Sequence, residues 1–142
     1  MEEQVLFCAC FNLRKAARAV TQFYDEALQP SGLRSTQFSL LAALDHMQSA
    51  TVSELAQGMV MDRTTLSRNL KPLEQKGWIK SVPGVDRRIR QLALTSKGEK
   101  VLAKALPLWK KVQKDMVSRL GKQQWKGLLQ HLNTTVQKAG PG

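Results

Sequence analysis

The chain has 142 residues, with 22 Lys and Arg against 11 Asp and Glu, so its formal net charge is +11. Apolar residues make up 42% and charged residues 23%, which excludes a disordered tail, a collagen-like chain and a disulfide-dense scaffold. The longest apolar run, 5–11, is far shorter than the roughly 20 residues of a membrane-spanning helix. The length fits one domain, 1–142, and the charge favours an anionic partner such as nucleic acid.

The positive charge is concentrated in the later part of the chain. Residues 1–61 hold four basic and six acidic side chains, 62–100 hold ten and four, and 101–142 hold eight and one. Glu2 and Glu3 stand where an export signal would be basic, so the expected location is the cytoplasm, with no membrane partner.

The first predicted element is a long helix over 5–28. Its apolar residues recur at three- and four-residue steps, which is the pattern of one helical face. That face comprises Leu6, Cys10, Leu13, Ala17, Val20, Tyr24 and Ala27. So wide a face needs a large partner surface, which a second copy of the chain would supply. Cys8 and Cys10 would point about 200° apart on this helix, which disfavours a disulfide between them.

A second helix is predicted over 35–48, after the loop signal at 30–32. Ser35 and Thr36 are its candidate capping residues. The residues expected in its core face are Phe38, Leu41, Ala42 and Met47.

A helix-turn-helix pattern follows. Thr51 and Glu54 have the spacing of a capping box and begin a short helix that Gly58 should end. After a brief turn, Asp62 is placed to cap a helix over 63–76. The expected buried stripe of that helix continues past an internal proline at position 72 and comprises Leu66, Leu70 and Leu73.

The pattern after Gly77 changes to a β-hairpin and then returns to helix. Residues 78–82 and 89–94 are β-rich and flank a turn. Thr95 is placed to cap a long helix that Gly121 ends, and a last helix follows. The apolar stripes of these two helices comprise Leu102, Ala105, Trp109, Val112, Met116, Leu120, Trp125, Leu128, Leu129, Leu132 and Val136.

Enzyme signatures are absent, since the chain has no GxSxG, P-loop or GxGxxG motif, and His46 and His131 lack nearby Cys or paired carboxylates. We therefore expect that the protein is not an enzyme and that it has no cofactor and no metal site. A helix-turn-helix before a basic hairpin instead suits duplex DNA, because a helix fits the major groove. The residues placed to reach the duplex from the second helix are Arg63, Thr64, Thr65, Ser67, Arg68 and Lys71.

The hairpin tip is a second basic element. It carries Arg87, Arg88 and Arg90, whose planar guanidinium groups suit phosphates and a narrow minor groove. Asp86 is placed to orient one of these groups. A charged turn that only aids solubility is the alternative interpretation.

Two segments resemble the MarR family of bacterial winged-helix transcriptional regulators. DRRIRQLALTSKG at 86–98 matches the family's wing signature, and TVSELAQGMVMDRTTLSRNLKPLEQKGWI at 51–79 is similar to its helix-turn-helix. The resemblance implies a mainly α fold with a small β-hairpin wing. It implies a winged helix-turn-helix lobe at 35–100, flanked by dimerisation helices at 5–34 and 101–140.

The resemblance also implies a homodimer that binds a pseudo-palindromic operator, as a repressor released by a small anionic or phenolic ligand or by thiol oxidation. The segment 10–24 is similar to the hydroperoxide-sensing branch, with Cys10 as the thiol and Tyr24 at a tyrosine position. Arg14 stands where that branch has another tyrosine, and a buried, inert Cys10 is the alternative. The residues expected at the ligand or thiol sensor are Cys10, Arg14, Tyr24, Phe38 and Trp109.

Two other functions stay open. The basic C-terminal third is compatible with an architectural protein that coats DNA without sequence preference. The apolar first helix is compatible with a winged-helix protein–protein module.

Overall fold

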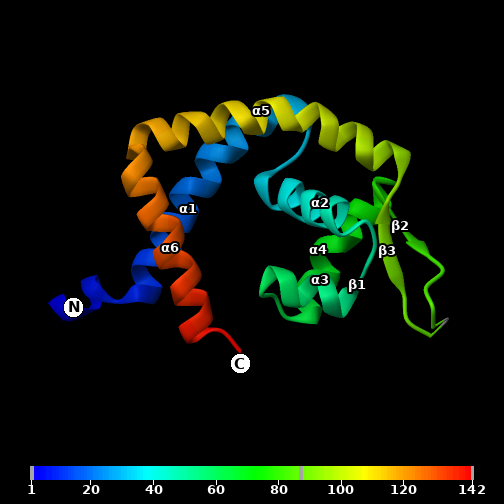
Figure 1. The fold of residues 1–142 in the computed structure, drawn as a ribbon, viewed down its shortest axis with the longest axis horizontal. Helices are drawn as coiled ribbons and strands as arrows, with labels where there is room; N and C mark the ends of the chain where they lie inside the picture. The colour runs from blue at the N-terminus through cyan, green and yellow to red at the C-terminus, as the bar shows by residue number, and fades with distance from the viewer. Residues whose placement is uncertain (1, 87, 142) are drawn as a thin grey trace.

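The structure is a computed structural model and describes residues 2–86 and 88–141. Figure 1 shows two lobes joined by the long helix α5 (Ser96–Leu120). One lobe holds the helices α1 (Ala9–Leu28) and α6 (Lys122–Ala139). The other lobe holds α2 (Ser35–Met47), α3 (Val52–Met59), α4 (Arg63–Gln75), β1 (Ala50–Thr51), β2 (Ile79–Val82) and β3 (Gln91–Leu94). The predicted fold class, mainly α with a small β wing, is confirmed.

The first helix begins later than the sequence predicted. Cys8 has an extended backbone (φ −67, ψ 127) and separates a short 3-10 helix, η1 (Glu3–Phe7), from α1. The two cysteines therefore do not share one continuous helix. Cys10 lies in the first turn of α1 and is exposed in the single chain.

The start of α2 also differs from the prediction, because neither Ser35 nor Thr36 caps it. A second 3-10 helix, η2 (Gln29–Ser31), ends the preceding segment. The side chain of Gln37 accepts a hydrogen bond from the Arg34 backbone N–H at 3.0 Å, and a carboxylate oxygen of Asp25 accepts one from the Ser35 N–H at 2.6 Å. Gln37 within the helix and Asp25 on α1 thus take the place of the expected hydroxyl caps.

The core face of α2 is mostly as predicted. Phe38 and Leu41 are buried, and Ala42 packs against the core while partly exposed. Met47, the last residue of α2, is 36% exposed and does not belong to the core.

The caps of the helix-turn-helix are confirmed, but its first helix ends differently. Thr51 and Glu54 form the capping box, and Asp62 caps α4 through the Thr65 N–H at 2.9 Å. Helix α3 continues through Gly58 to Met59, and the left-handed residue Val60 (φ 54, ψ 47) caps its C-terminal end. Assigning the stop to Gly58 was therefore wrong.

The wing is a three-stranded antiparallel sheet in the order β1-β3-β2. Ile79 pairs with Leu94 in the predicted hairpin, while Ala50 of β1 pairs with Leu92 on the other side of β3. Only two residues long, β1 is too short to show a periodic pattern, so the sequence did not predict it.

The junction between the wing and α5 depends on Thr95 and Gly98, at the end of the segment 86–98 that resembles the wing signature. The Thr95 hydroxyl donates to the Gly77 carbonyl at 2.5 Å and accepts from the Gly98 N–H at 3.0 Å. A Cβ on Gly98 would lie 2.0 Å from the Trp78 carbonyl oxygen, so no side chain fits there. These two residues thus fix α5 against the start of the wing.

The hydrophobic core lies mainly in the winged lobe and includes Leu28 at the end of α1. Its largest fully buried side chains are Leu28, Leu41, Leu44, Leu55, Leu66, Leu73 and Leu92. None of the residues of α6, all of which the structure describes, is buried. Within 2–86 and 88–141, no helix has both the length and the apolar character needed to span a membrane.

Candidate functional site

Helix α4 presents a polar face to solvent and an apolar face to the core. Leu66, Leu70 and Leu73 are buried, as predicted, and the helix continues past Pro72. The residues expected to reach DNA, all of them exposed, are Arg63, Thr64, Thr65, Ser67, Arg68 and Lys71. Because the buried stripe fixes the rotation of α4, this polar face points away from the lobe and is accessible to a duplex.

The N-terminus of α4 is held by Asp62. Its carboxylate accepts hydrogen bonds from the Thr65 hydroxyl at 2.5 Å and the Thr65 N–H at 2.9 Å. These two bonds, the hydroxyl first, lower the pKa of the Asp62 carboxyl, because both stabilise its charged form. Thr65 therefore has a capping role within the protein, beside its expected role at the DNA surface.

The tip of the wing carries an arginine that is almost fully exposed. The Arg88 side chain is 94% exposed, and its Nε lies 3.7 Å from an oxygen of Asp86. The same oxygen accepts a hydrogen bond from the Arg88 N–H at 3.0 Å, so Asp86 lies where an orienting residue is expected. Arg87 falls outside the residues that the structure describes.

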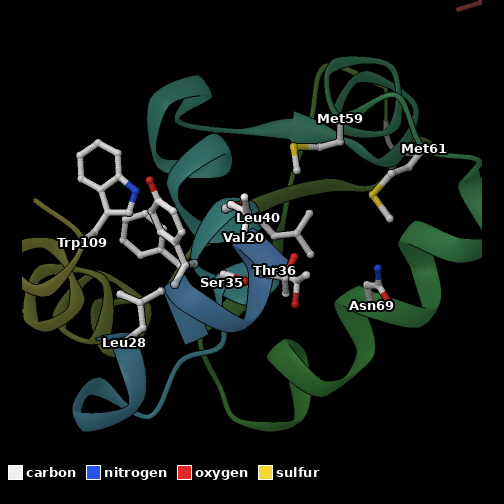
Figure 2. Close-up of a pocket in the computed structure, with 13 residues that line it drawn as sticks. Val20, Leu28, Ser35, Thr36, Leu40, Met59, Met61, Asn69 and Trp109 are labelled. Atoms are coloured by element: carbon white, nitrogen blue, oxygen red, sulfur yellow. The ribbon is translucent and has the colours of Figure 1, made fainter. Parts of the chain in front are cut away.

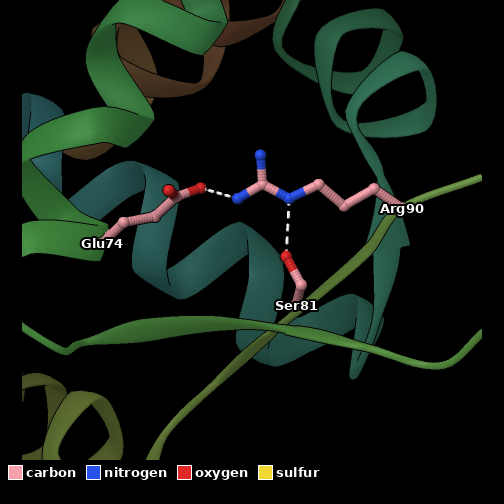
Figure 3. A network of polar contacts seen from close by, with 3 residues as sticks. All are labelled: Glu74, Ser81 and Arg90. Carbon is pink, nitrogen blue, oxygen red and sulfur yellow. Dashed lines mark hydrogen bonds and ion pairs between the residues drawn. The ribbon is translucent and has the colours of Figure 1, made fainter.

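Arg90 lies directly before β3, at the loop end of the hairpin, where Val82 pairs with Gln91. Its Nε donates to the Ser81 hydroxyl on β2 at 2.6 Å, and a terminal nitrogen forms an ion pair with Glu74 near the end of α4 (Figure 3). The sequence predicted all three arginines at the hairpin tip, because it does not show which residues form the turn. The structure separates Arg90 from Arg88 by giving it two partners within the protein.

A cavity of about 410 Å³ lies between the two lobes. Figure 2 shows Leu28 and Trp109 at one side of it and Met59, Met61 and Asn69 at the other. Its lining residues come from α1, α2, the end of α3, α4 and α5, and they are Val20, Thr21, Tyr24, Leu28, Ser35, Thr36, Phe38, Ser39, Leu40, Met59, Met61, Asn69 and Trp109. The cavity therefore connects α1 and α5, outside the winged lobe, to α4, which is the candidate recognition helix of the helix-turn-helix.

Three of the five residues expected at the sensor line this cavity. The rings of Phe38 and Trp109 are stacked, with centroids 5.9 Å apart, and the Tyr24 hydroxyl donates to the Gln113 side chain at 2.5 Å. Burial raises the pKa of the Tyr24 phenol, so it is neutral at pH 7. Cys10 and Arg14 are exposed near the start of α1 and do not line the cavity, because α1 carries them away from the winged lobe.

Sequence reasoning missed Met59, Met61 and Asn69 as cavity residues. Asn69 follows Arg68 and lies about 100° further around α4. Asn69 was outside the predicted DNA-facing set, and this rotation is the signal that could have assigned it another role. Met59 and Met61 flank the left-handed turn, whose position the sequence misassigned.

The lining of the cavity contains no Arg, Lys or His among the residues that the structure describes. The polar groups of the lining side chains are hydroxyls, one amide and the indole N–H of Trp109, which bind neutral donors and acceptors. Nor do three His, Cys, Asp or Glu side chains gather as a metal site within 2–86 and 88–141.

A model of the MarR family matches residues 33–89. YwoH of Bacillus subtilis, an uncharacterised helix-turn-helix transcriptional regulator, is 32% identical over 88 residues, which cover 62% of this chain and just under two thirds, 64%, of that protein. The transcriptional regulator MosR of M. tuberculosis, solved in complex with DNA, is 41% identical with a TM-score of 0.84, covering 93% of this chain and 96% of that one. The chain belongs to the MarR family.

A second solved structure is similar over nearly the whole chain. CouR, a transcriptional repressor solved with a 23-mer DNA duplex, is 27% identical with a TM-score of 0.82, covering 94% of this chain and 96% of that one. This MarR-family chain is accordingly a DNA-binding transcriptional regulator.

Proposed function

We propose that the chain acts as a homodimeric, sequence-specific repressor that binds a pseudo-palindromic operator. The observation that carries the proposal is the exposed polar face of α4 beside a wing with an exposed arginine at its tip. Arg68 on α4 suits a bidentate contact with guanine, while Lys71 suits a phosphate. In this proposal Arg87 and Arg88 of the wing reach the flanking minor groove or backbone.

The apolar residues left exposed in the single chain support a dimer. On η1 and α1 they include Leu6, Phe7 and Phe11, exposed by 51%, 83% and 37%. On α6 they include Leu128 and Val136, exposed by 42% and 49%. A second copy that packs on these helices would remove this apolar surface from water and would set the spacing of two recognition helices.

Selection from a pool of random duplexes tests the proposed operator. We expect an enriched two-fold pseudo-palindrome whose half-site centres lie about one helical turn apart. If no sequence is enriched at physiological salt, specific recognition is excluded.

The competing function is a nonspecific architectural coat, which the basic C-terminal third motivates. Arg68→Ala separates the two, because a base contact affects the operator more than other DNA. Loss of about 1–3 kcal/mol on the operator alone supports base reading. Equal weakening on every duplex supports the coat.

We further propose that a small phenolic effector binds in the inter-lobe cavity and releases the operator. The stacked Phe38 and Trp109 rings offer an aromatic surface, and Asn69 connects the cavity to α4. Since no cationic side chain is among the described lining residues, neutral phenols should release DNA at lower concentration than carboxylates of the same size. Equal potency of the two would contradict this assignment.

Oxidation of Cys10 is the second release route that we propose, because this thiol is exposed and separate from the cavity. Peroxide should release operator from the wild type and not from Cys10→Ser. Identical release from both proteins would remove Cys10 from the proposal, while the response to phenols would be unaffected.

A further inference from the structure

One arginine of the wing links three elements of the DNA-binding lobe. Arg90 directly precedes β3, and its guanidinium contacts Ser81 on β2 and Glu74 near the end of α4 (Figure 3). Thus the same planar group joins both sides of the hairpin to the candidate recognition helix. Its fixed fork of donors suits two simultaneous partners.

The partners of Arg90 distinguish it from Arg88 at the tip. Arg90 is half exposed, at 50%, with its Nε and a terminal nitrogen directed to Ser81 and Glu74. Arg88 is 94% exposed, and its Nε lies 3.7 Å from Asp86. Arg90 is therefore oriented toward the protein, while Arg88 extends into solvent.

Glu74 places a negative charge beside the proposed DNA surface. Ser67, Lys71, Glu74 and Arg90 line one shallow depression between α4 and the wing. A carboxylate there repels a phosphate backbone, so Glu74 opposes DNA binding unless it has another role. Pairing with Arg90 provides such a role.

We infer that Arg90 is a positioning residue that ties the wing to α4 through Glu74 and Ser81, and not a residue that contacts DNA. Beyond their own pairing, β2 and β3 gain only the two-residue strand β1 as a neighbour in the sheet. So small a sheet has little stability of its own, and its angle to α4 therefore depends on such ties. With the angle fixed, the wing and the recognition helix reach the duplex together. This inference rests on the proposed function, in which both elements bind the operator.

The test compares Arg90→Gln, Glu74→Gln and the double variant, with Gln75→Ala as the control for an exposed neighbour on α4. Operator affinity is measured over a range of salt concentrations, and hydrogen exchange of the β2 and β3 amides is measured without DNA. Each single substitution should weaken operator binding about two- to fivefold, the range of an exposed ion pair. The double variant should lose no more than either single variant, because one interaction is removed in all three.

Two readouts separate positioning from a phosphate contact or general stability. The salt dependence of binding should be unchanged in Arg90→Gln, whereas Arg88→Gln should lower its slope by about 1. The β2 and β3 amides should exchange faster in Arg90→Gln and Glu74→Gln, with the thermal midpoint unchanged. Gln75→Ala should change none of these quantities.

Tighter operator binding by Glu74→Gln would overturn the inference, as would a lowered salt slope in Arg90→Gln. Unchanged exchange of the wing amides would also overturn it. If the wild type selects no operator, the proposed function fails by itself, and the exchange measurement on the free protein still decides whether Arg90 ties the wing to α4.

Discussion

The positions with the strictest requirements on residue type lie where two elements of the structure join. Gly98 allows α5 to approach the Trp78 carbonyl, which no side chain would permit. Asp62 holds the first turn of α4 through Thr65. Each requirement follows from specific contacts in the structure, so each predicts the effect of a single substitution.

Replacing Gly98 by Ala should lower the free energy of unfolding by about 1–3 kcal/mol, the usual cost of forcing extra atoms into a packed site. The added Cβ would meet backbone, which cannot rotate away. Urea unfolding measures the change. Gly58→Ala in α3 is the matched control, because a Cβ there meets nothing within 4 Å, and it should not destabilise the protein.

The Asp62 cap predicts a pH dependence of stability. Because its folded pKa is lowered, the cap is fully present above the ordinary Asp pKa of about 3.9 and is lost as the pH falls through the folded value. Asp62→Asn keeps an accepting oxygen but does not titrate. The difference in thermal midpoint between wild type and Asp62→Asn should therefore be constant from pH 6 down to about pH 4 and shrink as the pH falls below about 3.9. A constant difference would contradict the cap.

At the scale of elements, the sequence predicted most of what periodicity and capping determine. The caps at Thr51, Asp62 and Thr95 are as expected because each depends on residues three positions apart. The break at Cys8 and the strand β1 were missed because neither has a periodic signal. The cavity, too, could be predicted only in part, since it joins residues from helices far apart in the sequence.

The turn of the helix-turn-helix predicts a stabilising substitution. Val60 is β-branched and left-handed, a conformation that costs L-residues about 1–2 kcal/mol. Val60→Gly should therefore raise the free energy of unfolding by about 1 kcal/mol after the flexibility of glycine is counted. Val60→Ala keeps the steric cost and should give no comparable gain. Equal effects of the two substitutions in urea unfolding would contradict this explanation.

At the scale of the whole molecule, the chain has one core and a second lobe without buried residues on α6. The net charge of +11 becomes +22 in the proposed dimer, which should raise the rate of encounter with DNA. The described part of the cavity already joins the two lobes within one chain. In the proposed dimer, a molecule bound in that cavity would therefore affect the spacing of the two recognition helices.

A charge on the exposed apolar face of α6 should disrupt the dimer. Leu128→Glu introduces a carboxylate at a 42% exposed leucine, and an interface there would leave it buried without a partner. Sedimentation equilibrium should show monomers, with operator affinity lowered at least tenfold. Gln130→Glu adds the same charge at an exposed polar position of α6 and should remain dimeric. A dimeric Leu128→Glu protein would place the interface elsewhere.

Hydroxyl-radical footprinting on the selected operator, combined with the mass of the complex, tests whether the protein binds DNA as a sequence-specific dimer. We expect two chains per duplex and two protected half-sites with centres about 10 base pairs apart, or 34–36 Å in roughly straight B-DNA. Flanking protection should weaken in Arg88→Gln while the half-sites stay in register. Continuous protection without half-sites, or one chain per site, would contradict a dimeric, sequence-specific regulator.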